Sequence, residues 1–311
     1  MKTASHHSSF FLWLKKIPLV VFSSALILCT THLYATSKII SDTEQSFTRT
    51  EFIDLTSKSD TQKDIIYLAV AANFKSTLQQ LVSAFILEHP NIKEEQLKII
   101  SGATGALYAQ IMQGAPFDIF FAADINRPHL LIENKHAENG TYYSYAYGQL
   151  ILAFPAKEKK HCSHAISQPS ELIEFLNHFQ LQTKPTLVIA NPTTAPYGLS
   201  ANSLIDKAAE EFSKYRIVKG KNILHAQQLL LNSHADLAIL STAQANHATM
   251  MDYDFCLIKQ SLYTTIEQAL VIIKQANRTQ NQQYLIKQFF HFMKTEKAQT
   301  IILSNGYLIH E

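Results

Sequence analysis

Four short segments of this chain place hydrogen-bond donors at or before the start of a predicted helix, and the first three also follow a predicted strand. They are residues 71–74, 102–105, 194–198 and 221–223. A helix N-terminus presents backbone N–H groups without helical partners and a partial positive charge, so it suits an anion. The sequence therefore predicts a site for a small oxyanion, built from several helix starts.

Each segment contributes a different donor. Asn73 offers a side-chain amide, and Thr104 offers a hydroxyl in a turn with two glycines. Tyr197 and Ile223 offer their backbone N–H groups. Each segment alone also fits a structural role: an N-cap at Asn73, a plain turn around Thr104, a solvent-facing Tyr197, and an ordinary helix start at Ile223. The repetition of one arrangement is what indicates an anion.

The first three segments contain no lysine or arginine. Neutral donors and helix dipoles can hold an oxyanion without burying an unpaired cationic side chain. The glycine turn at residues 102–105 lacks the Gly-Lys-Ser/Thr ending of a phosphate-binding P-loop. Asp124 is the nearest carboxylate, and we expect it to cap a strand end, because it would repel an anion if it faced one.

Alternating apolar runs and amphipathic segments are expected to position these donors. Continuous apolar runs predict buried strands, and helical spacing of apolar residues predicts helices. Strands are expected at residues 65–71, 97–100, 118–122, 147–154, 186–190, 237–240 and 269–273, and helices near residues 78–86, 107–112, 169–179, 199–212, 222–231, 284–293 and 297–303. This order predicts an α/β protein with parallel sheets, whose ligand lies beyond the carboxyl ends of strands.

The composition excludes some classes of function. The 311 residues carry a net charge of +2 and no long basic run, which argues against nucleic acid as a partner. No motif of a serine hydrolase or zinc protease is present. A lyase or transferase on an α/β scaffold is the enzymatic alternative, and it would need a titratable group in the cleft. His161 and His164 flank Cys162, which fits either a surface loop or a metal cluster.

The N-terminal residues have the features of an export segment. Lys15 and Lys16 precede an apolar run over residues 17–29, and Ala35 offers a small residue for cleavage. We expect a signal peptide or a retained anchor over residues 1–35, then a flexible polar leader over residues 36–64. If export removes Cys29, Cys162 and Cys256 remain, either as a disulfide or as two free thiols.

Several motifs together resemble the periplasmic molybdate-binding proteins of ABC transporters. They are Ala-Ala-Asn-Phe at 71–74, Gly-Ala-Thr-Gly-Ala-Leu at 102–107, Gln-Ile at 110–111, Gly-Ala-Pro-Phe-Asp-Ile-Phe at 114–120, Asn-Pro at 191–192, Ala-Pro-Tyr-Gly at 195–198, Ile-Glu-Gln-Ala at 266–269 and Asn-Gly-Tyr at 305–307. The resemblance implies a two-lobed type II periplasmic-binding-protein fold, in which each lobe is a mostly parallel sheet flanked by helices. One lobe would hold residues 65–145 and 259–311, the other residues 146–258, with the ligand between them.

The resemblance also assigns contacts. It implies that Asn73, Thr104, Tyr197 and Ile223 bind the oxyanion, with Ala72 and Ala103 adding backbone N–H groups. A second tyrosine used by some members falls at about Ser241 here, which leaves the fifth contact open. We expect an exported, non-enzymatic monomer without a cofactor or a directly coordinated metal, which binds molybdate or tungstate and serves a membrane permease. A protein of the same fold for sulfate, phosphate or another small anion is the alternative.

Overall fold

A computed structural model describes residues 64–156, 162, 164–177, 184–246 and 248–309 of the chain. The chain divides into two units, residues 1–58 and 59–311, and all the described residues belong to the second. The predictions of a signal or anchor and of a leader fall outside the described residues, apart from Asp64. Within the described part, no helix is long and apolar enough to cross a membrane.

The first of two five-stranded sheets has the strand order β2-β1-β3-β10-β4. Its strands are β1 (Ile66–Ala71), β2 (Leu97–Gly102), β3 (Ile119–Ala122), β4 (Tyr143–Gly148) and β10 (Ile266–Ile272). β1 pairs in parallel with β2 and β3, whereas β10 runs antiparallel to β3 and β4. Only β10 is reversed, so the sheet is mostly parallel, as the family resemblance implies.

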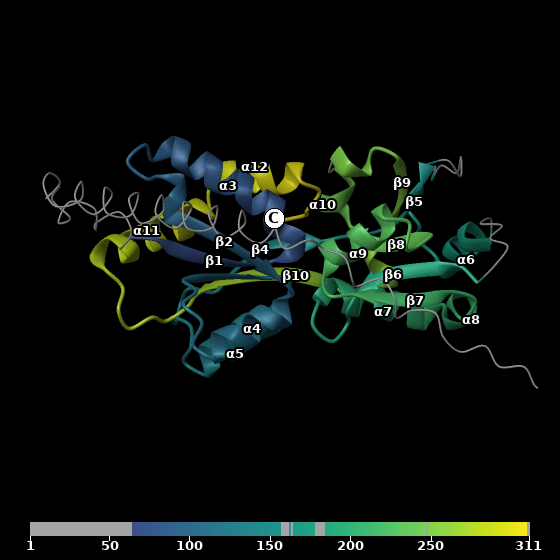
Figure 1. Cartoon of the computed structure of the whole chain (residues 1–311), viewed down its shortest axis with the longest axis horizontal. Coiled ribbons are helices and arrows are strands. Elements are labelled where there is room, and N and C mark those ends of the chain that lie inside the picture. The colour runs from purple at the N-terminus through teal and green to yellow at the C-terminus, as the bar shows by residue number, and fades with distance from the viewer. Residues whose placement is uncertain (1–63, 157–161, 163, 178–183, 247, 310–311) are drawn as a thin grey trace, which may run out of the picture. The chain divides into compact units, whose positions relative to one another are not determined.

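Helices cover both faces of this first sheet (Figure 1). Alternate residues of β1 point to opposite faces, so Leu68 packs against one set of helices and Ala69 against the other. One face carries α3 (Lys75–Glu88), α11 (Gln280–Phe292) and α12 (Glu296–Ser304), and the other carries α4 (Thr104–Met112) and α5 (Asn126–Glu133). Burial on both faces explains why the strands read as continuous apolar runs.

The second sheet repeats this design with the order β7-β6-β8-β5-β9. Its strands are β5 (Leu150–Pro155), β6 (Thr186–Ala190), β7 (Arg216–Gly220), β8 (Leu237–Ser241) and β9 (Tyr253–Ile258). β6 pairs in parallel with β7 and β8, and β5 is the reversed strand. β1 and β6 thus hold equivalent positions in the two sheets, and so do the edge strands β2 and β7.

The helices of the second sheet include α7 and α9, which flank it (Figure 1). In the described part of this lobe the helices are α6 (Pro169–Asn177), α7 (Pro196–Lys207), α8 (Ala209–Phe212), α9 (Ile223–Leu231) and α10 (Thr242–Ala245). Short 3-10 helices are η1 (Ala72–Phe74), η2 (Glu94–Gln96), η4 (Ala248–Met250) and η5 (Gln260–Leu262).

Two predicted elements differ from the structure. The single strand expected at residues 147–154 is two strands, β4 and β5, which lie in different sheets. The expected run starts in the last two residues of β4, and only Gln149 separates them from β5. The helix expected at 199–212 divides at Ala208 into α7 and α8. Because β4 extends to Gly148, we propose Gln149, rather than residues 145–146, as the first boundary between the lobes.

A disulfide joins Cys162 to Cys256 on β9, with the two Cα atoms 5.4 Å apart. That separation is within the usual range for a disulfide. The structure thus favours the disulfide over two free thiols. Since a disulfide sulfur is not a thiolate ligand, Cys162 does not support the metal cluster. His161 lies outside the described residues, and the imidazole of His164 lies 4.0 Å from the Glu171 carboxylate.

Candidate anion site at four strand ends

A small cavity lies at the carboxyl ends of β1, β2, β6 and β7. It is lined by Ala71, Ala72, Asn73, Gly102, Ala103, Thr104, Ala123, Ala195, Pro196, Tyr197, Asn222 and Ile223. The centre of a water-sized sphere can occupy only about 10 Å³ of it. Pockets for drug-sized ligands measure roughly 300–1,000 Å³. The cavity is therefore far too small for a drug-sized ligand.

Helix starts surround the cavity. η1 begins at Ala72 and runs directly into α3, α4 begins at Thr104, α7 at Pro196 and α9 at Ile223. The first N–H groups of each helix have no helical acceptor, and the helix dipole adds partial positive charge. Among the residues described as lining it, none is lysine, arginine or a carboxylate. The cavity can therefore attract an anion through neutral donors alone.

Thr104 places its hydroxyl in the cavity wall with a defined orientation. The side chain is 1% exposed, and its oxygen accepts a hydrogen bond from the Ala123 N–H at 3.2 Å. Because this bond uses an acceptor position, the hydroxyl hydrogen stays available to donate. This geometry suits an oxyanion acceptor in the cavity.

Ile223 is the first residue of α9, and its position is fixed by its neighbours. The Asn222 side chain caps the helix by accepting from the His225 N–H at 2.9 Å. Gln244 donates to the Ile223 carbonyl at 3.1 Å. These two contacts hold the Ile223 N–H at the cavity, where it can donate to a ligand.

Ser241, the predicted fifth contact, is not among the residues that line the cavity. It is fully buried, and its hydroxyl donates to Gln244 Oε1 at 3.2 Å. Its contact to the site is therefore indirect, through Gln244 and the Ile223 carbonyl. A serine is too short to reach the place that a tyrosine could fill from this position.

Tyr197 is buried rather than solvent-facing, with 2% of its surface exposed. It is the second residue of α7, so its N–H is among the free donors of that helix. Its hydroxyl accepts a hydrogen bond from Gln268 Nε2 at 3.5 Å. Burial raises the pKa of the Tyr197 hydroxyl well above its ordinary value of 10, so the group stays neutral.

Asn73 lines the cavity, but its amide is engaged elsewhere. Its Nδ2 donates to Gln268 Oε1 at 2.7 Å and to the Tyr307 hydroxyl at 3.2 Å. The expected donation from this amide to the oxyanion is therefore not what the structure shows, because both amide hydrogens already have acceptors. The N-cap alternative does not hold either, because Asn73 lies within η1 and caps nothing through its side chain.

A backbone contact closes the cavity between the two sheets. The Gly105 N–H of α4 donates to the Thr194 carbonyl, before α7, at 2.8 Å. A Cβ atom at position 105 would lie 3.0 Å from that carbonyl oxygen and from the Arg127 guanidinium. Only glycine fits this approach without displacing its neighbours.

Asp124 and Arg127 form an ion pair beside the site. Asp124 also accepts the Arg127 N–H at 2.9 Å, at the start of α5. The Asp124 carboxylate is thus engaged by Arg127, and Ile125 is the N-cap residue of α5. The pairing also neutralises the charge of both side chains near the cavity.

The structure brings together Ala72, Asn73, Ala103, Thr104, Tyr197 and Ile223. Sequence reasoning did not assign a site role to Gln268 or Tyr307, which contact Asn73 from outside the cavity. Their motifs are part of the family resemblance, but nothing in the local pattern shows that β10 and the C-terminal segment return to this point.

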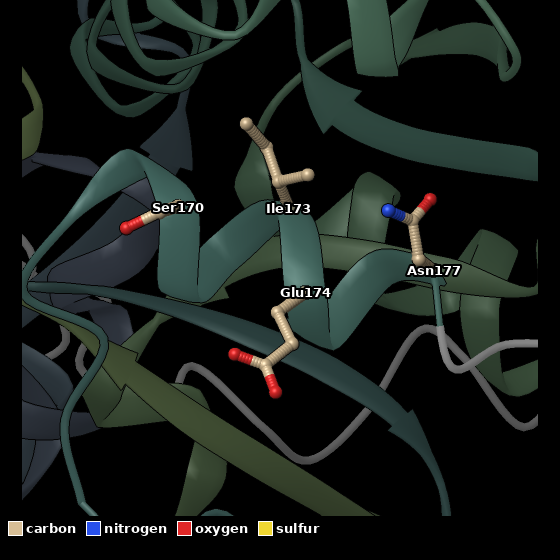
Figure 2. A pocket seen from close by; sticks show the side chains of 4 residues that line it. All are labelled: Ser170, Ile173, Glu174 and Asn177. Carbon is tan, nitrogen blue, oxygen red and sulfur yellow. The ribbon is translucent and has the colours of Figure 1, made fainter.

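A second pocket lies on α6 and differs in chemistry. Figure 2 shows Ser170, Ile173, Glu174 and Asn177, all from this one helix. The Glu174 carboxylate in its wall disfavours an anion. We therefore assign the anion to the cavity at the four strand ends.

Comparisons with known proteins agree with this fold. The family model described as bacterial extracellular solute-binding protein matches residues 66–308. The molybdate-binding protein ModA of Azotobacter vinelandii is 30% identical over 246 residues, which cover 78% of this chain and 89% of the relative. ModA of Rhodobacter capsulatus is 28% identical over 246 residues, covering 78% of this chain and 88% of the relative.

A solved structure supports the same assignment. The Azotobacter vinelandii periplasmic molybdate-binding protein superimposes with a TM-score of 0.65 at 27% identity, covering 79% of this chain and all of the other. Two mixed α/β sheets with a cavity between their strand ends define a two-lobed solute-binding protein. The chain belongs to the family of bacterial extracellular solute-binding proteins.

Proposed function

We propose that this protein binds molybdate outside the cytoplasm and delivers it to an ABC transporter. The observation that carries the proposal is the convergence of four helix starts on a small cavity without charged side chains. The relatives named for molybdate binding, found over most of the chain, select the anion. Tungstate has the same tetrahedral shape and nearly the same size, so we propose that it binds as well.

The proposed contacts follow from the geometry. The Thr104 hydroxyl and the backbone N–H groups of Asn73, Tyr197 and Ile223 donate to the oxygens of the anion, and Ala72 and Ala103 add backbone N–H groups. Each oxygen of the anion accepts hydrogen bonds in place of water, and hydrogen bonds to a charged group are about twice as strong as neutral ones. The anion supplies the metal already bound to its oxygens, so no side chain of the protein coordinates it.

We further propose a working cycle without catalysis. The protein acts as an exported monomer, free in the periplasm or tethered by its N-terminal segment, and the membrane permease of an ABC transporter is its partner. Sedimentation of the purified protein tests the monomer. Fractionation of cells tests whether the protein is released or stays with the membrane.

Isothermal titration with molybdate, tungstate, sulfate and phosphate tests the proposed ligand. We expect molybdate and tungstate to bind with similar affinities and at least about a hundredfold more tightly than sulfate, which is smaller and leaves donors without acceptors. Preference for sulfate or phosphate would replace molybdate by the alternative ligand within the same fold.

A further inference from the structure

We propose that Gln268 is the positioning residue of the anion site. Its one amide group holds Asn73 from the first sheet and Tyr197 from the second, and so it joins the two halves of the site when they close on the anion. The proposal rests on the proposed function, because it concerns how the same cavity retains its ligand.

The position of the Gln268 amide is fixed by its partners. Oε1 accepts from Asn73 Nδ2 at 2.7 Å. The Tyr145 hydroxyl lies 3.4 Å from Oε1, with the Ala122 carbonyl as its nearer acceptor at 3.1 Å. An amide oxygen only accepts and an amide nitrogen only donates, so Nε2 must point the other way. It points to the Tyr197 hydroxyl, at 3.5 Å. The Gln268 side chain is fully buried, so water does not compete for these contacts.

Asn73 is held on its other side by Tyr307. The Asn73 amide donates to the Tyr307 hydroxyl at 3.2 Å, and that hydroxyl donates to the Asn73 carbonyl at 2.8 Å. Both Asn73 and Tyr307 are buried. Buried, fully paired networks of this kind rigidify the groups they contain. Gln268 therefore contacts a rigid half of the site in the first sheet.

Tyr197 reaches this network from the other sheet. It lies on α7, yet a Cβ atom at Gly148 on β4 would come within 2.1 Å of its hydroxyl oxygen. Gly148 thus leaves the space that lets the Tyr197 ring enter between the sheets. Tyr197 has its backbone N–H at the cavity and its hydroxyl at Gln268, so one residue links the anion site to the contact between sheets.

This arrangement couples closure to anion retention. Two-lobed binding proteins close around a ligand by hinge motion. When the lobes separate, the Tyr197 hydroxyl loses its hydrogen bond with Gln268 and forms one with water instead. When they close without an amide at position 268, the hydroxyl is buried without that donor, which disfavours the closed state. Loss of Gln268 therefore speeds anion release and leaves capture unchanged.

A double-mutant cycle with Gln268→Met and Tyr197→Phe tests this role, with rates measured by stopped-flow. We expect each single variant to raise the dissociation rate of molybdate about tenfold and to change the association rate less than about twofold, as for loss of one buried hydrogen bond. The effect of the double variant should be smaller than the product of the two single effects, because both single changes break the same contact between Gln268 and Tyr197. Additive effects, or unchanged dissociation rates, would overturn the proposal.

Tyr215→Phe is the matched control. Tyr215 is also buried, and its hydroxyl donates to the Leu176 carbonyl at 3.3 Å, in the second lobe and outside the cavity wall. This variant should lower the free energy of unfolding without changing the dissociation rate. If Gln268→Met does not fold, the contrast between Tyr197→Phe and Tyr215→Phe decides alone, and equal dissociation rates for these two variants refute the proposal.

The proposed function and the proposed role of Gln268 can be tested separately. If the wild type prefers sulfate or phosphate, the cycle is run with that anion and the same outcomes apply. If it binds none of the four anions, spin labels at Leu87 and Met251, both well exposed, report the distance between the lobes, with Cys29 replaced by serine. Gln268→Met should then widen the distribution of distances. Identical distributions would overturn the role of Gln268.

Discussion

At the scale of single residues, Thr104 is the side chain whose chemistry bears most directly on the anion. Its hydroxyl accepts from the Ala123 N–H, which leaves its own hydrogen free for the ligand. We expect Thr104→Val to weaken molybdate binding by about 1.5–3 kcal/mol, the range for a hydrogen bond to a charged group. Calorimetric titration measures the change.

Thr104→Ser is the control for this prediction, because serine keeps the hydroxyl and removes a methyl group. Its affinity for molybdate should stay within about threefold of the wild-type value. That change is smaller than the loss expected when one hydrogen bond to a charged group is removed. Equal affinities for all three proteins would show that the hydroxyl does not contact the anion.

The residue scale also shows where prediction from sequence reached its limit. The positions of Asn73, Thr104, Tyr197 and Ile223 at one cavity could be predicted, because strand ends and helix starts are local features. The hydrogen-bond partners of the Asn73 amide could not be predicted in this way. Gln268 and Tyr307 lie 195 and 234 residues away in sequence, and only the folded chain shows that they complete this contact.

At the scale of elements, the start of α9 separates helix stability from anion binding. Asn222→Asp keeps a good N-cap and adds a negative charge that favours the helix start by roughly 0.3–1 kcal/mol. The same charge repels a bound anion at the cavity that Asn222 lines. We expect unchanged or higher stability in urea together with at least about tenfold weaker molybdate binding.

Thr295→Asp provides the matched control on another helix. Thr295 caps α12 by accepting from the Ala298 N–H at 3.3 Å, and it is absent from the cavity wall. Like Asn222→Asp, this variant should have unchanged or higher stability in urea. Its affinity for molybdate should equal that of the wild type. Equal losses of affinity in the two variants would point to a general charge effect rather than to a site at α9.

The elements themselves were foreseen unequally. Long buried strands such as β1 and β6 were predicted because both faces are covered, which gives continuous apolar runs. The edge strands β7 and β9 were missed, because half-exposed residues interrupt their pattern. β4 and β5 were merged, since only Gln149 separates them, although they belong to different sheets.

At the scale of the whole molecule, the disulfide lies at the far edge of the second sheet from the site. Cys256 is on β9, whereas the donors lie at β6 and β7, at the other side of the strand order. We expect a variant with Cys162→Ser and Cys256→Ala to lose about 2–4 kcal/mol of stability in urea. Its molybdate affinity should stay at the wild-type value. A weakened affinity would mean that β9 influences the cleft.

The buried tyrosines predict a loss of stability at high pH. Burial raises the pKa values of Tyr145, Tyr197 and Tyr307 above the ordinary value of 10. A raised pKa in the folded state means that this stability is fully present below pH 10 and is lost as the pH rises toward the folded-state values. Urea unfolding from about pH 8 to about pH 11, across the ordinary tyrosine pKa, should show a steady free energy of unfolding and then a decline. A free energy of unfolding that stays constant to about pH 11 would contradict the predicted loss of stability.

The most direct test of the account is a crystal structure grown with tungstate, in which the anomalous scattering of the metal locates the anion. We expect one strong anomalous peak between the starts of α4, α7 and α9 and the turn η1. Its oxygens should lie within hydrogen-bond distance of the Thr104 hydroxyl and the Tyr197 and Ile223 N–H groups. A peak bound elsewhere, or by lysine or arginine side chains, would contradict a site built from neutral donors at four strand ends.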